Sequence, residues 1–575
     1  MARATRPTIA LIAACAVAAG CTETIRLTRD PLDQLVAIEI APGDAMIKVT
    51  DLALPHHTLQ YMAMGRFADG TTRDITAFAD WTFDNGFLGT FEQPFEQPGL
   101  FTASHAAAGR GIVTAQARDM IASAPLAVAI DATIVDGSFP PPAANLFDPL
   151  YPVVIADPTR APALIYPAEG TVFPLDISRT LFQYQRGAVN DAFRIVFQSE
   201  LLRLTVETGA DRWEADGDVQ RMLAWTGSVT PIQAEVYATS SAAAGTVFLG
   251  NRITIDFTSD SPGGPLYFWS AATSGIMRGG LDVTSASKLD PGSTTCVGCH
   301  TLSRDGTQMA MGTGSSSTPN LTTIDVGTLG PKISPSPSRP MGWGTYSPDG
   351  AQLLVANNGI LTLYNATTGA SLGTVSLPPM RYATHPDWSP DGRYVVVALT
   401  SLVPTNLDVR AASIVQLPYN DGAWGPPEYI VSGSMTSNNY FPRYSPDGDW
   451  LAFVRATTGS QGAASAELML VQAAGGTPRR LRIASHRIGT TDDVPDLANT
   501  MPVWSPRKGE RSWLAFVSSR AYGAVLPTAG RGQIWVTSLD LDSTADPSSA
   551  AFWLPCQDVT VLNNNPVWSS VFETQ

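Results

Sequence analysis

Hydrophobic and polar residues alternate along much of this chain with the period of two that is typical of β-strands. The run from Tyr61 to Phe67 alternates in this way, and so do the segments "IQAEVYATS" and "GNRITIDFTSD" up to about residue 260. Because successive side chains of a strand point to opposite faces, this alternation predicts half-buried strands. The 49 glycines and 44 prolines supply frequent turns. The pattern therefore predicts an all-β protein.

One phrase is repeated through the second half of the chain. Its copies are "LSRDGTQMAMG" (302–312), "YSPDGAQLLVAN" (346–357), "WSPDGRYVVVAL" (388–399), "YSPDGDWLAFVR" (444–455), "WSPRKGERSWLAFVS" (504–518) and the beginning of a sixth in the terminal "VWSSVFETQ". The serines of these copies are 44, 42, 56, 60 and 64 residues apart. This spacing is that of propeller blades with their loops.

The residues of the phrase predict how a blade is built. We expect each copy to open a blade, with its aromatic residue between blades, its Ser-Pro-Asp-Gly as a turn and its apolar run as a strand. The segment "PLYFWSAATSG" (265–275) resembles a second strand that lacks an opening phrase, and the terminal "WSSVFETQ" can supply the missing first strand. This predicts six blades closed by a strand from each end, with seven blades or an open five as alternatives.

The repeats resemble the TolB-type β-propeller, whose signature is this W/Y-S-P-D-G phrase before an apolar strand, and the resemblance covers roughly residues 264–575. Arg507-Lys508-Gly509 depart from the pattern in the fifth copy. The resemblance implies a propeller that docks a partner. The repeated carboxylates have two interpretations, calcium binding and turn formation, and we favour turns because the residues are identical and lie on separate blades. They are Asp305, Asp349, Asp391 and Asp447.

The first half of the chain predicts two sandwich domains. Residues 36–131 resemble the bacterial Ig-like group-2 domain, which implies a spacer or adhesion module. Residues 132–162 are rich in proline and predict an extended linker. Residues 163–260 predict a second sandwich of the immunoglobulin or fibronectin type III kind. The positions that carry the group-2 resemblance are Gly65, Phe67, Asp69, Gly70, Asp74, Thr76, Trp81, Gly99, Phe101 and Thr102.

The N-terminal segment predicts export. Arg3 and Arg6 precede an apolar run that is too short to span a bilayer, as in a secretory signal. Residues 18–21 resemble a bacterial lipobox, which implies that Cys21 is acylated and anchors the protein to a lipid membrane. The leucine usual three residues before that cysteine is missing, so an ordinary cleaved signal is the alternative. Residues 1–21 are then the signal and residues 22–35 a tether to the cell envelope, on its periplasmic side or outer surface.

The charge of the chain excludes one class of partner. With 36 Lys and Arg against 51 Asp and Glu, the formal net charge is −15. Such a surface repels phosphate backbones, and we therefore predict no nucleic-acid binding.

Cys296, Cys299 and His300 form the motif C-x-x-C-H immediately before the first repeat. Two thiols at this spacing form thioethers with the haem vinyl groups, and the adjacent imidazole ligates the iron, so the motif predicts covalent haem c. A zinc site would need further ligands at suitable spacing, and a thioredoxin-like site would be expected to open a helix. A structural disulfide is the remaining alternative. The lone Cys556 predicts a buried packing residue.

The haem motif adjoins one of six segments that we expect to be loops around the mouth of the propeller channel. In the other segments, His385 and Met501 are the candidates for the distal iron position, and a methionine there would raise the reduction potential relative to histidine. The expected function is electron transfer between this haem and a redox partner in the envelope. A non-catalytic binding or scaffold protein is the alternative. Hydrolase motifs are absent, and peroxidase-like activity at an open iron position stays open.

Overall fold

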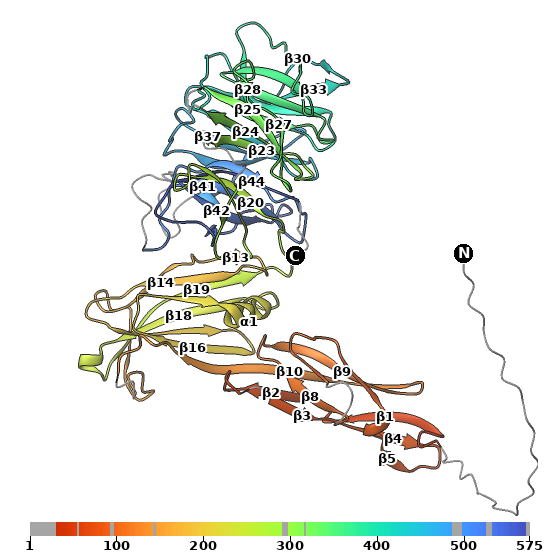
Figure 1. The fold of residues 1–575 in the computed structure, drawn as a ribbon. Helices are drawn as coiled ribbons and strands as arrows, with labels where there is room; N and C mark the ends of the chain where they lie inside the picture. Colours follow the sequence, from red (N-terminus) through yellow and green to blue (C-terminus); the bar gives the residue numbers. More distant parts are fainter. Residues whose placement is uncertain are drawn as a thin grey trace, which may run out of the picture.

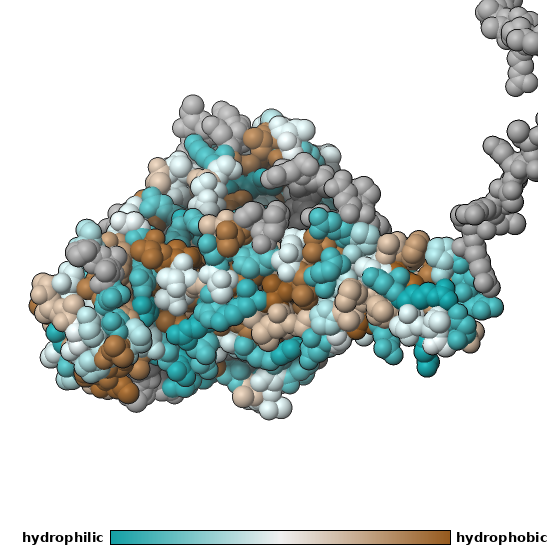
Figure 2. Space-filling model, turned by 90° about the horizontal axis from the view of Figure 1, so that it is seen from below, coloured by the Kyte–Doolittle hydropathy of each residue, from teal (hydrophilic) through white to brown (hydrophobic). Residues whose placement is uncertain are grey.

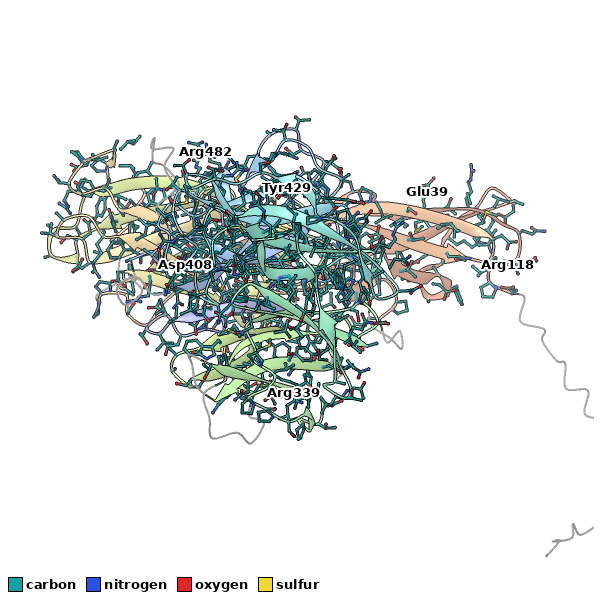
Figure 3. The ribbon with its side chains drawn as sticks, turned by 90° about the horizontal axis from the view of Figure 1, so that it is seen from above. Glu39, Arg118, Arg339, Asp408, Tyr429 and Arg482 are labelled. Atoms are coloured by element: carbon teal, nitrogen blue, oxygen red, sulfur yellow. The ribbon has the colours of Figure 1, made fainter. Side chains whose placement is uncertain are left out.

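The computed structural model describes residues 30–54, 57–91, 97–141, 145–289, 297–314, 318–485, 497–524 and 532–570. These residues form strands almost throughout, which confirms the predicted all-β class. Figure 1 shows three parts in succession: a first sandwich, a second sandwich and a propeller. In the view from above, Glu39 and Arg118 on the first sandwich lie far to one side of Tyr429 in the propeller (Figure 3). The first sandwich therefore projects away from the propeller.

The first sandwich is built around a cluster of aromatic rings. Trp81 is 3% exposed, and its ring centroid lies 5.4 Å from that of Phe91 and 6.0 Å from that of Tyr61. One 3₁₀ turn, Thr76–Phe78, lies beside it. The strands are β1 (Leu35–Ala41), β2 (Ala45–Val49), β3 (His57–Gln60), β4 (Met62–Phe67), β5 (Thr72–Asp74), β6 (Asp80–Phe83), β7 (Gly89–Phe91), β8 (Leu100–Ala103), β9 (Gly109–Ala117) and β10 (Met120–Val135).

The second sandwich packs a three-stranded sheet, β12-β14-β17, and one α-helix against a larger sheet. A short 3₁₀ turn, Ser241–Ala243, precedes the last strand. The elements are β11 (Val153–Ile155), β12 (Ala163–Tyr166), β13 (Thr171–Phe173), β14 (Arg179–Gln185), β15 (Ala192–Gln198), β16 (Leu202–Thr208), β17 (Arg212–Asp216), α1 (Gly217–Gly227), β18 (Ile232–Thr239) and β19 (Val247–Phe257).

Strand β10 joins the two sandwiches through one continuous sheet. Its first part pairs with β9 and β2, and its last part, Ile130–Val135, pairs in parallel with β16. The boundary expected at residue 131 therefore falls inside a strand. The segment expected as an extended linker also packs Phe139 and Phe147 into a small core with Val247. The prolines of this segment mark turns, whereas the aromatic residues around them are buried.

The propeller contains six sheets in the described residues, as predicted. Blade 1 consists of β23 (Val297–Leu302), β24 (Gln308–Gly314), β25 (Pro319–Asp325) and β26 (Pro331–Ile333). Blade 2 consists of β27 (Trp343–Tyr346), β28 (Gln352–Asn357), β29 (Ile360–Asn365) and β30 (Ser371–Thr374). Blade 3 consists of β31 (Tyr382–Trp388), β32 (Tyr394–Thr400), β33 (Ser413–Asn420), β34 (Ala423–Trp424) and β35 (Glu428–Val431).

Blade 4 consists of β36 (Asn438–Tyr444), β37 (Trp450–Ala456), β38 (Glu467–Gln472) and β39 (Arg479–Arg480), and α2 (Arg482–Ser485) follows it. Blade 5 consists of β40 (Thr500–Trp504), β41 (Ser512–Ser518), β42 (Gln533–Leu539) and β43 (Phe552–Trp553). Blade 6 consists of β20 (Leu266–Ser270), β21 (Gly275–Gly279), β22 (Ser287–Lys288) and β44 (Asn563–Trp568).

Blade 6 closes the ring with strands from both ends of the propeller. Strand β44 pairs antiparallel with β20, and Trp568 lies opposite Leu266. The indole Nε1 of Trp568 also donates to the carbonyl oxygens of Gly263 (2.8 Å) and Gly264 (3.1 Å). Closure by both ends is therefore as predicted.

The position of the repeated phrase within a blade differs from the prediction. The aromatic residue of the phrase ends the innermost strand, and the apolar run that follows is the second strand, as in β27 and β28. The phrase therefore connects two strands and does not open the blade. The segments expected to be loops around the channel are the innermost strands themselves.

The turn of the phrase is held by its serine and aspartate. In blade 3, Ser389 Oγ donates to Asp391 Oδ1 (2.6 Å) and accepts from the backbone N–H of Tyr394 (3.0 Å). Gly392 has a φ of +76°, which favours glycine. The same serine–aspartate bond recurs in blades 1, 2 and 4. These carboxylates therefore form turns, and no group of three or more metal-ligating side chains gathers anywhere in the described ranges.

The second sandwich is fixed to blade 5 by polar and aromatic contacts. The backbone N–H of Trp553 donates to the hydroxyl of Tyr166 (3.1 Å), and Arg179 Nη2 donates to the carbonyl of Pro555 (2.7 Å). The rings of Phe173 and Phe552 lie 5.0 Å apart. Viewed from below, hydrophobic residues form small groups separated by hydrophilic ones (Figure 2). Apolar surface is thus used mainly inside the sheets and between neighbouring parts.

Candidate functional site

Six equivalent residues, one from each innermost strand, form a ring in the propeller. Each lies four positions before the repeated serine or its equivalent. The innermost strands of successive blades contact one another around the closed ring. The sequence prediction of equivalent positions is therefore correct, although they lie in strands. The six residues, called here the ring residues, are Cys299, Trp343, His385, Phe441, Met501 and Asn565.

A β-bulge gives most of these residues an unusual backbone. Cys299, His385, Phe441, Met501 and Asn565 have φ values of +36°, +53°, +49°, +53° and +49°, and the strand register shifts at each. A bulge leaves a residue unpaired and bends the strand. Proline follows the ring residue in blades 3 to 6, where its missing N–H costs no ladder bond. In blade 1 this position is occupied by His300.

His300 is buried beside the closing strand. Its side chain is 4% exposed, and Asn565 Nδ2 lies 3.2 Å from His300 Nδ1 and donates to the carbonyl of His300 at 3.2 Å. Burial lowers the pKa of His300 to about 4, although the backbone of Tyr267 acts in the opposite direction. The Nε2 atom is buried, and its contact with the backbone of Tyr267 falls short of hydrogen-bond geometry. The imidazole is therefore neutral at pH 7, and no side chain of the described residues binds its Nε2.

Cys299 has a free thiol and is partly exposed. Burial raises the pKa of this thiol to about 11, so it is protonated at neutral pH. Cys296 and Cys21 lie outside the described residues. The other described cysteine, Cys556, is 5% exposed and belongs to the main hydrophobic core, as predicted for a packing residue.

The residues at the C-x-x-C-H motif fit a covalent haem by their donor chemistry. A bare imidazole nitrogen on His300 follows directly after a free thiol on Cys299, which is the order that haem c attachment requires. The side-chain amide of Asn565 has both an N–H donor and a carbonyl acceptor, so it can hold either tautomer of the imidazole. A metal-ligating histidine commonly has such a partner on its other nitrogen.

The two distal candidates share the ring but have other surroundings. The ring of His385 lies 3.7 Å from that of Phe441 and 5.1 Å from that of Trp343, and its side chain is 2% exposed. Burial lowers the pKa of His385 well below its usual value. Met501 is partly buried against the main core. Within the described ranges, no hydrogen bond or ring contact joins either residue to His300.

A second feature, which the sequence reading missed, is a cavity of about 260 Å³ within the propeller channel. Each of the six innermost strands contributes one residue to the lining of this cavity, namely the residue two positions after its ring residue. Asp387 and Arg443 on neighbouring blades form an ion pair here, with Nη1 and Oδ1 3.6 Å apart. Burial raises the pKa of Asp387, and Arg443 and Arg304 oppose this shift. The sequence could have indicated this cavity, because blades 3 and 4 have a charged residue at a position where the other blades have threonine or valine. The six residues at this position are Thr301, Thr345, Asp387, Arg443, Val503 and Val567.

Several solved structures are similar to part of this chain. TolB from Acinetobacter baumannii is similar over 59% of this chain and 79% of its own, with 13% identity and a TM-score of 0.37. A chain described as TolB from Agrobacterium tumefaciens is similar over 54% and 99%, with 16% identity and a TM-score of 0.30. The Cps50 (Swd1) propeller domain of Myceliophteria thermophila is similar over 46% and 72%, with 16% identity and a TM-score of 0.30.

No protein-family model and no curated protein matches this chain. The resemblance of residues 36–131 to the bacterial Ig-like group-2 domain therefore stays a prediction. No helix among the described residues is long and apolar enough to cross a membrane. The described residues define an all-β fold with two sandwiches and a six-bladed propeller, whose first blade contains Cys299 and His300 of the C-x-x-C-H motif.

Proposed function

We propose that this chain is an exported haem c protein of the cell envelope, and that the haem on its propeller transfers single electrons to a redox partner. The observation that carries the proposal is the buried Nε2 of His300, which no side chain of the described residues binds. Blades 3 to 6 have proline at this position, so blade 1 departs from its own repeat to place an iron-binding side chain directly after a cysteine.

In this proposal each residue of the motif has a distinct role. Cys296 and Cys299 would hold the haem through thioethers, and His300 Nε2 would ligate its iron. Asn565 orients the imidazole from the neighbouring blade. The haem supplies one-electron redox chemistry when it is bound. His385 and Met501 are retained as candidates for the distal position because they belong to the same ring of residues.

The remaining parts of the chain serve to position the propeller. Cys21 is proposed as the lipid attachment site, and the two sandwiches separate the N-terminal segment from the propeller (Figure 1). The continuous sheet through β10 supports a spacer role, because it joins the sandwiches by backbone hydrogen bonds.

The decisive experiment is a mass measurement on the exported chain, produced in a host that can mature c-type cytochromes. We expect the mass of one covalently attached haem and a pyridine haemochrome spectrum of the c type. A chain that lacks the added mass in such a host, with both thiols titratable after reduction, contradicts the proposal.

A second candidate is a non-catalytic propeller that binds a partner or ligand. The cavity with its partly buried ion pair between Asp387 and Arg443 favours this function, since charges that are partly removed from water are costly unless they have a structural or binding role. A Cys296→Ala, Cys299→Ala double variant that keeps all partner binding would support it.

A further inference from the structure

The channel cavity is built from every blade of the propeller. Each innermost strand contributes the residue two positions beyond its ring residue, and the turns that follow add further lining. At the level of the ring residues, Trp343, His385 and Phe441 are in mutual ring contact. The cavity lies between that level and the repeated turns. Its volume of about 260 Å³ is close to the lower end of ligand pockets, which are roughly 300–1,000 Å³.

The charged groups around this cavity are unbalanced toward positive charge. Arg443 and Arg304 face Asp387, and the pKa of Asp387 is influenced by both guanidinium groups. Asp387 also accepts a hydrogen bond from the backbone N–H of Tyr444 (2.8 Å). The cavity therefore contains two guanidinium groups and one carboxylate, although the chain as a whole has a formal net charge of −15.

Both arginines are held in place by backbone carbonyls. Arg443 Nη1 donates to the carbonyl of Pro386 (3.0 Å), and Arg304 Nη2 donates to the carbonyl of Trp388 (2.6 Å). Arg304 occupies the position that is proline in blades 2 to 5. A guanidinium group that is fixed in this way loses less conformational entropy when it binds an anion.

We propose that the propeller channel binds a small oxyanion, a carboxylate or phosphate group, through Arg443 and Arg304. Guanidinium groups match the planar, bidentate geometry of such groups. The cavity is too small for a nucleotide and suits a compact acid. The site does not require haem, so it is tested separately from the proposed electron transfer.

The test is isothermal titration calorimetry of the full exported chain with inorganic phosphate and with citrate, at constant ionic strength. We expect one site per chain. Arg443→Gln and Arg304→Gln should each weaken binding about tenfold, as expected for the loss of a charge-assisted hydrogen bond. Asp387→Asn should strengthen binding, because it removes the one negative charge. This opposite sign separates a change of charge from a general loss of structure.

Arg393→Gln is the matched control. Arg393 lies in the corresponding turn of blade 3, its side chain is 76% exposed, and its Nε donates to Asp391 Oδ2 (2.6 Å) outside the cavity. The affinity of the Arg393→Gln variant for phosphate and citrate should equal that of the unmodified chain. If the Arg443→Gln variant does not fold, the affinity of the Arg304→Gln variant tests the proposal. The proposal is overturned if neither anion binds, or if neither arginine variant weakens binding. A preference for phosphate or for citrate identifies whether the site takes a phosphate or a carboxylate group.

Discussion

Blade 1 and blade 3 use the same strand in two different ways. Both have a bulge at the ring residue, and both have a turn in which serine donates to aspartate. In blade 3 the ring residue His385 is followed by a proline and packs between aromatic rings. In blade 1 the ring residue is Cys299, and His300 replaces the proline.

This difference shows how one copy of a repeat can carry different side chains without losing its fold. His300 has a backbone N–H and pairs in register with Met311, which a proline could not do. Its side chain then enters the space beside β44, where Asn565 holds it. The bulge and the turn are common to the blades, so the substitutions change only what occupies the ring and the position after it.

The largest expected effect is on haem attachment. The Cys296→Ala, Cys299→Ala double variant should lose covalent haem completely, because no thiol of the motif is left to form a thioether. The measurement is intact mass together with the haemochrome spectrum. Trp343→Phe, at the ring position of blade 2, is the control and should keep the haem. Covalent haem on the double variant would contradict the assignment to blade 1.

The next largest expected effect is on stability, and it compares the last residue of the innermost strand in blade 3 with that in blade 1. Trp388 in blade 3 is 1% exposed and its Nε1 donates to the carbonyl of Gly392 (3.1 Å), whereas blade 1 has Leu302 at this position. Trp388→Ala should lower the free energy of unfolding by about 3–5 kcal/mol, and Leu302→Ala by about 2–3 kcal/mol. Urea denaturation measures both. An equal or larger loss for Leu302→Ala would show that blade 1 depends on its core as strongly as blade 3.

The third effect concerns the contact that is specific to blade 1. Asn565→Leu leaves the carbonyl and Nδ1 of His300 without their donor and should cost about 1–3 kcal/mol. Met501→Leu, at the ring position of blade 5, conserves volume and should cost less than about 1.5 kcal/mol. Denaturant midpoints at pH 7 check the pair. If both variants are equally stable, Asn565 does not hold His300.

The smallest effect tests what the two blades share. Burial tends to raise the pKa of Asp391, but hydrogen bonds from Ser389 and Arg393 outweigh it and lower this pKa to about 2. A lowered pKa stabilises the fold fully above the unfolded value of about 3.9 and less as pH falls through about 2. Because Asp391 is 44% exposed, solvent screening keeps the effect small.

We therefore expect Asp391→Asn to be less stable than the unmodified chain above pH 4, and this difference should disappear as the pH falls toward 2. Asp305→Asn in blade 1 should behave alike, since the pKa of Asp305 is also lowered. Thermal melts across this pH range measure both variants. Opposite trends for the two would show that the turns are not equivalent.

Much of this architecture could be predicted from the sequence because its signals are local. The Ser-Pro-Asp-Gly turn needs only the conformations and hydrogen bonds of adjacent residues, and the spacing of its copies sets the blade size. The innermost strands were missed because they are short and contain a proline in most blades, which argues against a strand. The β-bulge makes a proline compatible with these strands, because a bulged residue needs no ladder hydrogen bond, as at Met501 and the proline that follows.

The candidate site was predictable only in part. The motif at Cys296, Cys299 and His300 lies within five residues, so it could be recognised in the sequence, and the haem chemistry that it implies stays a prediction. The contact of His300 with Asn565 joins residues 265 positions apart and depends on closure of the ring. The ion pair of Asp387 and Arg443 likewise depends on two neighbouring blades.

The sequence by itself determined the all-β class, the repeated turns, the number of blades and the residues of the C-x-x-C-H motif, because each of these follows from residues that are close together or repeated. Only the tertiary structure decided that β10 unites the two sandwiches, that the C-terminal strand lies against His300, and that arginines from separate blades meet in one cavity. Such contacts between distant segments are set by the closing of sheets and rings, and no local pattern of residues encodes their distances.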